Sequence, residues 1–160
     1  MRIVKNITKN VMPNNNPDLT QQAPRSARVR LGGFVILPRM LDKCRATLEG
    51  KNGEYHFNCP LDQRFLSFVG IDAEALKAEV ATGKGDGEIL NWILANASNK
   101  PNDAEIAAWS AYAEQRVPSD VETRAYFNDL HSKTGANRED IFTWFDLLDL
   151  DDYVSYGGIA

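Results

Sequence analysis

The chain has few cysteines, few histidines and no long hydrophobic run. Two cysteines and two histidines in 160 residues are too few for the disulfide framework of a small secreted protein, and they match no zinc-binding pattern. No apolar stretch approaches the roughly 18 residues that cross a bilayer, and the first residues lack the apolar segment of a secretion signal. We therefore expect a cytoplasmic domain with free thiols, no membrane partner, no metal and no cofactor.

Familiar catalytic motifs are missing as well. The glycine-rich segment 83–87 lacks the phosphate-loop pattern, and the chain contains no G-x-S-x-G elbow, which excludes the commonest nucleotide-hydrolase and esterase signatures. The composition itself is ordinary, with 43% hydrophobic and 25% charged residues, so neither disorder nor a repeat architecture is indicated. A chain of this length is expected to bury one compact core.

Charge is distributed unevenly along the chain. The net charge is -4, but the first 45 residues carry nine bases against two acids, whereas the remaining 115 carry nine bases against twenty acids. Because opposite charges attract at contact distance, we expect the basic first third to pack on the acidic remainder. A nucleic-acid surface is the alternative, but a pI of 5.2 and the lack of a binding motif argue against nucleic acid as a partner.

Hydrophobic periodicity and capping residues predict an all-α fold of about seven short helices with almost no strand. The first 22 residues contain several helix breakers and are expected to form an extended arm, followed by a single helical domain over residues 23–160. The expected N-caps are Asp72, Asp86, Asn102 and Ser119. The helices are expected at residues 38–49, 60–69, 72–81 and 86–97, after Asn102, after Ser119, and at 139–150.

Cys59 precedes Pro60 at the expected start of a helix. If Cys59 is the N-cap residue, its sulfur lies beside unpaired N–H groups and the positive end of the helix dipole, which favours a thiolate. Asp62, three residues later, opposes this effect with its negative charge. Two interpretations of Cys59 therefore remain, a structural thiol and a thiol capable of nucleophilic or redox chemistry.

Two aspartates fall on the apolar faces of expected helices. At 100° per residue, Asp62 and Asp149 both project among hydrophobic side chains. A buried carboxylate must be ion-paired, hydrogen-bonded or protonated. Either Asp62 only complements the helix dipole and Asp149 is solvated at a frayed end, or cations meet them, with Arg25, Arg28 and Arg39 as the available suppliers for Asp149.

The face of the first expected helix that bears Arg39, Asp42 and Lys43 stands opposite its apolar stripe. Such a face is usually solvated, with Arg39 and Asp42 as a weak i,i+3 pair. If other elements cover it, Arg39 and Lys43 form a site for a carboxylate or phosphate.

Several short sequence segments, separated along the chain, point to a known family. They are Pro24-Arg25-Ser26, Leu31-Gly32-Gly33, Leu37-Pro38-Arg39, Asp42-Lys43-Cys44-Arg45-Ala46, Gly53-Glu54-Tyr55, Pro60-Leu61-Asp62 and Asp151-Asp152-Tyr153-Val154-Ser155-Tyr156-Gly157-Gly158. On these residues the chain resembles an uncharacterised bacterial family, domain of unknown function 5069. The resemblance implies a small, self-contained bacterial domain and no particular activity. The segments that carry the resemblance contain the charged residues described above.

We therefore predict a small-molecule binding protein or enzyme with an anionic ligand. The residues expected to hold the ligand are Arg25, Arg39, Asp42, Lys43 and Tyr55. In a catalytic version Asp62 is the general acid or base, and Tyr153 covers the pocket. The alternative is a non-catalytic interaction or structural module in which the same side chains form internal salt bridges.

Overall fold

The computed structural model describes residues 16–160, and this part of the chain contains seven α-helices and no strand beyond one isolated bridge. The predicted all-α fold is confirmed. Residues 1–15, most of the predicted arm, lie outside the described residues. The helices are α2 (Leu37–Leu48), α3 (Pro60–Val69), α4 (Ala73–Val80), α5 (Asp86–Asn96), α6 (Asp103–Gln115), α7 (Val121–Gly135) and α8 (Trp144–Ser155).

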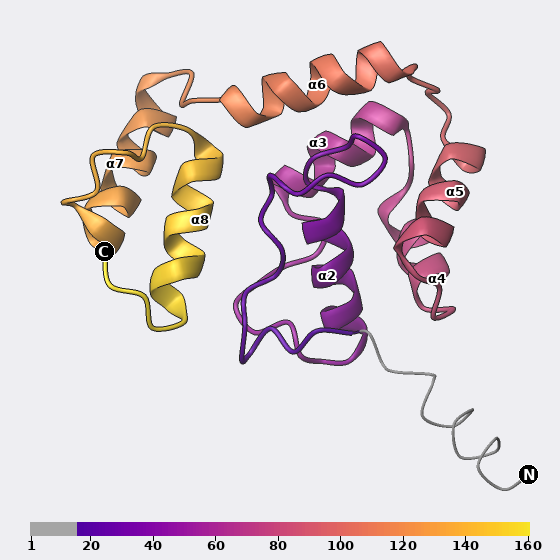
Figure 1. Cartoon of the computed structure of the whole chain (residues 1–160), viewed down its shortest axis with the longest axis horizontal. Coiled ribbons are helices and arrows are strands. Elements are labelled where there is room, and N and C mark those ends of the chain that lie inside the picture. Colours follow the sequence, from indigo (N-terminus) through magenta and orange to yellow (C-terminus); the bar gives the residue numbers. More distant parts are fainter. Residues whose placement is uncertain (1–15) are drawn as a thin grey trace, which may run out of the picture.

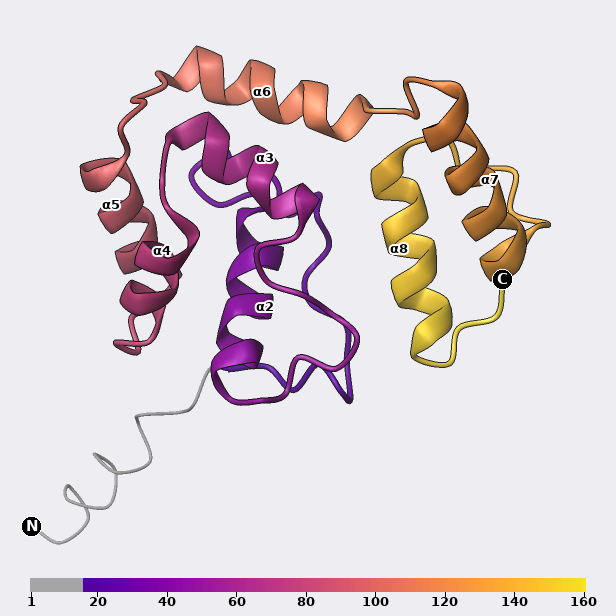
Figure 2. The same ribbon diagram turned by 180° about the vertical axis from the view of Figure 1, so that it is seen from behind.

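The helices are arranged around α2, which lies between α4 and α5 on one side and the α7–α8 pair on the other (Figure 1). Helix α6 passes over α3 and connects the two sides, as the view from behind also shows (Figure 2). We call residues 16–116 the body and helices α7 and α8 the hairpin. Among the described helices, none combines the length and apolar character needed to cross a membrane.

Helix α2 is buried on all its faces rather than on one stripe. Every residue from Leu37 to Ala46 is buried, including Arg39, Asp42 and Lys43. The loops before and after α2 run alongside the helix (Figure 1). Other elements therefore cover this face, which is the condition stated above for an anion site there. Arg39 and Asp42 do not pair with each other but with residues from other parts of the chain.

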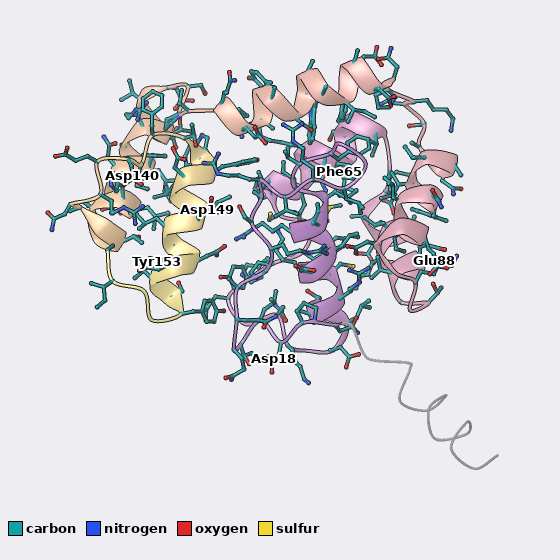
Figure 3. The ribbon with its side chains drawn as sticks, viewed as in Figure 1. Asp18, Phe65, Glu88, Asp140, Asp149 and Tyr153 are labelled. Carbon is teal, nitrogen blue, oxygen red and sulfur yellow. The ribbon has the colours of Figure 1, made fainter. Side chains whose placement is uncertain are left out.

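The main core joins α6 and α8 to the helices around α2. Phe34 and Phe65 are both fully buried and meet edge to face, with ring centroids 5.2 Å apart, and Phe65 is labelled in Figure 3. Phe68 stacks on Trp109 of α6 at 4.8 Å, and Phe145 of α8 enters the same core. Each fully buried aromatic ring of this kind contributes about 1.5–3 kcal/mol through removal from water.

A smaller core holds the hairpin together. Phe127 of α7 packs with Ile141, Leu147 and Leu150. The hairpin therefore has its own apolar contacts and docks on the body through Phe145 and through polar contacts described below.

Three expected helix starts were wrong by one to several residues. The last helix begins at Trp144 and not at residue 139, because Thr143 is its N-cap and accepts a hydrogen bond from the Asp146 N–H at 3.1 Å. Asp120 rather than Ser119 caps α7, since its carboxylate accepts from the Thr123 N–H at 2.7 Å. Asp86 is the first residue of α5, not its cap.

Residues 16–22 of the predicted arm belong to the described part of the chain. Leu19 is buried, and its N–H donates to the Lys51 carbonyl at 2.9 Å. The Tyr156 hydroxyl donates to the Leu19 carbonyl at 2.7 Å. This segment is thus held against the body and the end of α8.

Candidate functional site

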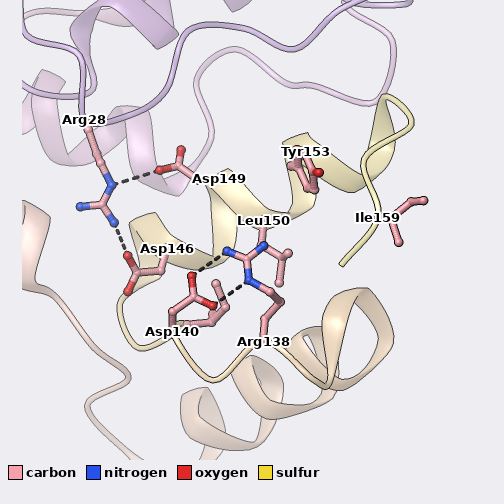
Figure 4. Close-up of a pocket in the computed structure, with 9 residues that line it drawn as sticks. Arg28, Arg138, Asp140, Asp146, Asp149, Leu150, Tyr153 and Ile159 are labelled. Carbon is pink, nitrogen blue, oxygen red and sulfur yellow. Dashed lines mark hydrogen bonds and ion pairs between the residues drawn. The ribbon is translucent and has the colours of Figure 1, made fainter.

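Helix α8 meets the body along a seam of acidic and basic residues. Arg28 pairs with Asp146 and, at 3.0 Å, with Asp149, as Figure 4 shows. The Ser26 hydroxyl also donates to Asp149, at 2.7 Å. The acids come from α8 and the bases from the first third of the chain, so the predicted attraction between the two regions operates here.

Arg39 makes the most enclosed contact of the seam. Its two terminal nitrogens donate to the two oxygens of Asp152, at 2.6 and 3.2 Å, and the Tyr55 hydroxyl donates to the same carboxylate at 2.8 Å. Burial opposes the charge on Arg39, but Asp152 outweighs burial and raises the pKa of the guanidinium. Burial and the bond to Asp152 raise the pKa of Tyr55 as well. Both side chains therefore keep their protons at neutral pH.

Lys43 links a buried acid to the thiol at the start of α3. Its ammonium lies 2.9 Å from Asp62 Oδ1 and donates to Cys59 Sγ at 3.2 Å and to the His56 carbonyl at 3.1 Å. Asp62 is completely buried, and its other oxygen accepts from the Asn58 N–H at 2.9 Å. Asp62 Oδ1 accepts no directed hydrogen bond, so its contact with Lys43 is an ion pair.

Arg25 and Asp42 form a separate network. The Arg25 backbone N–H and side chain both donate to Asp42, at 2.9 and 3.0 Å to the same oxygen. Arg25 and Arg45 each lie 2.7 Å from the carboxylate of Asp86. Burial disfavours the charge of Asp86, but these two arginines outweigh it and lower the pKa of the carboxyl. Arg25 and Asp42 are therefore occupied by internal partners.

A cleft of about 360 Å³ lies between the body and the start of α8. Four predicted site residues line it, namely Arg39, Lys43, Tyr55 and Cys59. The remaining lining residues are Glu54, His56, Pro60, Leu61, Arg64, Arg116, Trp144 and Leu148. Its volume lies in the range of small-molecule sites, and its lining contains four Lys or Arg residues against one acid. Arg25, Asp42 and Asp62 are not among the residues that line it.

The sequence interpretation missed two residues of this cleft, Arg64 of α3 and Arg116 at the end of α6. In the described chain, neither forms an ion pair with a carboxylate, unlike the other bases of the seam. Burial lowers the pKa of Arg116, the nearby charge of Arg64 lowers it further, and the Tyr112 hydroxyl offsets part of the effect. Two neighbouring positive charges therefore line the cleft, and neither is ion-paired in the described chain.

Local sequence held no signal for this pair. Arg64 is an exposed helix residue like many others, and Arg116 follows α6 on a different part of the chain. The Trp144 N–H donates to the Arg116 carbonyl at 3.0 Å, so the contact that starts α8 also places Arg116 at the cleft.

Tyr153 lies elsewhere, in a second hollow of about 430 Å³ (Figure 4). There Arg138 pairs with Asp140, and Arg28 pairs with Asp146 and Asp149. Each charged side chain of this hollow thus has an internal partner, with two bases against three acids. The structure does not bring Tyr153 together with Arg39, Lys43 and Tyr55.

Cys44 and Cys59 are both free but differ in their surroundings. Cys44 is buried in the main core, and this burial raises the pKa of its thiol to about 12. Cys59 is the N-cap residue of α3, as expected, and lines the cleft. Of the two thiols, only Cys59 is placed to meet a ligand there.

These features define an all-α domain in which a hairpin docks on a body by ion pairs and leaves a basic cleft between them. The sequence model of a domain of unknown function, DUF5069, matches residues 21–154. The chain therefore belongs to the DUF5069 family, as the resemblance predicted. A search of curated proteins gave no match.

Proposed function

We propose that this domain binds a small organic anion in the cleft between the body and α8. The observation that carries the proposal is the pair formed by Arg64 and Arg116, which face a cavity of about 360 Å³ and have no carboxylate partner among the described residues. Like charges brought together at a partly buried place cost free energy unless an anion is bound between them.

Most arginines of the described chain already have a carboxylate partner. The bases in the described part of the first third form ion pairs with carboxylates, for example Arg28 with Asp149, Arg39 with Asp152 and Lys43 with Asp62. A guanidinium matches the geometry of carboxylate and phosphate groups through paired N–H donors. Among the bases that line the cleft, Arg64 and Arg116 thus have the capacity for an anion, because Arg39 and Lys43 already meet carboxylates.

Asp62 has a positioning role in this proposal. Its carboxylate is fully buried and lies 2.9 Å from Lys43, which in turn reaches Cys59 at the wall of the cleft. We therefore do not retain Asp62 as an acid or base acting on a ligand. It holds the Lys43 ammonium in place and balances its charge.

A second candidate function has its own support. The network that includes Arg25, Asp42, Asp86 and Arg45 is entirely internal, as expected of a non-catalytic interaction or structural module. In that case the cleft is only the space left where the hairpin docks.

Thermal unfolding with different anions separates the two functions. The chain is heated with chloride, phosphate, benzoate or phenyl phosphate at equal ionic strength. A ligand at about 100 times its Kd stabilises the folded state by about 2.7 kcal/mol. We expect phosphate or an aromatic anion to raise the melting temperature of the wild type but not that of Arg64→Gln/Arg116→Gln.

Arg138→Gln is the matched control, because Arg138 is paired with Asp140 outside the cleft. It should keep the response to anions. Stabilisation that is equal for all salts, or that survives in the double variant, favours the structural module instead.

We also propose that the domain works in a reducing compartment, the bacterial cytoplasm. The support is the presence of two free thiols, Cys44 and Cys59, neither joined in a disulfide. Titration of thiols in protein purified without reductant and then unfolded should find two per chain. A covalent adduct or mixed disulfide on Cys59 in freshly isolated protein contradicts this location.

A further inference from the structure

The two cleft arginines without a carboxylate partner in the described chain line two hollows. Arg64 and Arg116 line the cleft of about 360 Å³, and they also line a neighbouring hollow of about 290 Å³. An anion bound by both guanidinium groups therefore lies at the border of the two hollows. A ligand group that extends from the anion can enter one hollow, the other, or both.

The two hollows offer different chemistry. The cleft presents the apolar side chains of Leu61, Trp144 and Leu148. The neighbouring hollow presents the hydroxyls of Tyr112 and Ser119 and the amide of Gln115. Apolar walls favour an aromatic or aliphatic group, whereas hydroxyl and amide groups favour hydrogen-bonding substituents.

The polar groups of the smaller hollow have capacity for a ligand. Gln115 and Ser119 are exposed, and in the described chain their side chains make no hydrogen bond to the protein. Tyr112 is 67% exposed and faces Arg116. Gln115 and Ser119 can therefore bind hydroxyls without first losing an internal partner, so their contacts add to affinity with little compensating cost. The Tyr112 hydroxyl already interacts with Arg116.

We propose that the ligand of this cleft is a phosphodiester, with its anionic phosphate between Arg64 and Arg116, an apolar group beside Leu61 and a hydroxyl-bearing group beside Ser119. This inference rests on the proposed anion-binding function. A carboxylate or a phosphate monoester carries one substituent and can fill one hollow only. A phosphodiester carries two substituents on opposite sides of a single charged group, which matches two unlike hollows that share the same arginines.

Calorimetric titration of the full chain with a matched pair of ligands tests the inference. Methyl phenyl phosphate and glycerol phenyl phosphate are both monoanions, and they differ only in the hydroxyl-bearing group. We expect the glycerol ester to bind roughly fivefold more tightly, because one added hydrogen bond contributes about 1 kcal/mol. Equal affinities overturn the inference.

Variants locate each part of the ligand. Gln115→Ala/Ser119→Ala should abolish the advantage of the glycerol ester and leave methyl phenyl phosphate unchanged. Leu61→Ala should weaken both esters by a similar factor, and Arg64→Gln should remove binding of both. An advantage that persists in the Gln115→Ala/Ser119→Ala variant overturns the inference.

The result also separates this inference from the proposed function. If methyl phenyl phosphate or benzoate binds in an Arg64-dependent manner but the glycerol ester gains nothing, anion binding stands and the phosphodiester assignment fails. If no anion binds, both fail. If the glycerol ester does bind more tightly, two natural phosphodiesters distinguish a nucleotide from a lipid source. They are a dinucleoside monophosphate and a short-chain lysophosphatidylglycerol below its micelle concentration. If neither of these two binds more tightly than methyl phenyl phosphate, that result also counts against the phosphodiester assignment.

Discussion

Arg39 of α2 and Asp152 of α8 face each other with two paired contacts, and Arg39 is only 3% exposed. The Tyr55 hydroxyl completes the arrangement by donating to the same carboxylate. This contact joins the centre of the body to the hairpin and borders the proposed ligand cleft.

Removal of the acid from this contact should destabilise the protein strongly. Asp152→Ala leaves a buried guanidinium without a counter-charge, and breaking such a pair costs about 3–5 kcal/mol. Urea unfolding monitored by circular dichroism measures the loss. Replacing both partners, as Arg39→Met/Asp152→Leu, should recover much of it, since no charge is then left unpaired.

Asp129→Asn is the control for this experiment. Asp129 pairs with Lys133 on an exposed helix face, with the two side chains 60% and 70% exposed. Its substitution should change stability by less than about 0.5 kcal/mol. A similar small effect from Asp152→Ala is incompatible with a closed contact between hairpin and body.

Neutralising Asp151 should raise the stability of the protein, whereas removal of Asp152 lowers it. Burial and the adjacent charge of Asp152 raise the pKa of Asp151, although Arg39 lowers it in part. Ionisation of Asp151 therefore costs more free energy in the folded protein than in the unfolded chain. Asp151→Asn should raise stability by roughly 0.5 kcal/mol, a magnitude typical of partly exposed charges. Denaturant unfolding at pH 7 checks this, and a destabilised variant contradicts the expected sign.

Acid should weaken the fold through Asp86 and Asp146. Contacts with Arg25 and Arg45 lower the pKa of Asp86 despite burial, and hydrogen bonds from Thr143 and Phe142 lower the pKa of Asp146 despite burial. The unfolded carboxyls, with pKa near 3.8, bind protons first as pH falls. The stabilisation is therefore complete above this value and is lost as pH falls through the lower folded-state pKa.

Unfolding free energies at several pH values between 7 and 2.5 measure this effect. Asp86→Asn should be less stable than the wild type at pH 7 and should show a shallower decline in acid, because one of the titrating groups is gone. An unchanged slope assigns the acid sensitivity to other carboxyls.

The two cysteines should differ in reactivity. In native protein a thiol reagent such as 5,5′-dithiobis(2-nitrobenzoate) should label Cys59 and leave Cys44 unmodified, because Cys44 is buried and its thiol pKa is raised to about 12. One thiol per chain is expected before unfolding and two after. Cys59→Ser should show none before unfolding, and fast labelling in that variant contradicts the assignment. An anion bound in the cleft should slow the reaction of Cys59.

The requirement that buried acids meet cations was predictable from sequence. Helix projection put Asp62 and Asp149 on apolar faces, and an unpaired buried charge is too costly to persist. Both acids are paired, the buried Asp62 with Lys43 and the partly exposed Asp149 with Arg28. The identity of the partners followed only in part, since Arg28 was one of three candidates for Asp149 and no candidate was named for Asp62.

The cleft illustrates what sequence patterns could not provide. Arg39, Lys43, Tyr55 and Cys59 were predicted as site residues from charge and helix position, and all four line it. Arg25 and Asp42 came from the same reasoning but bind each other.

The amino-acid sequence by itself determined the helices and the sign of the charges that join the two ends of the chain. Capping, periodicity and local charge act over a few residues, so their effects can be derived position by position. Only the tertiary structure decided where α8 docks and that Arg64 and Arg116 share one cleft. These contacts depend on how remote helices pack, and no local energy term specifies which base then lies beside which acid.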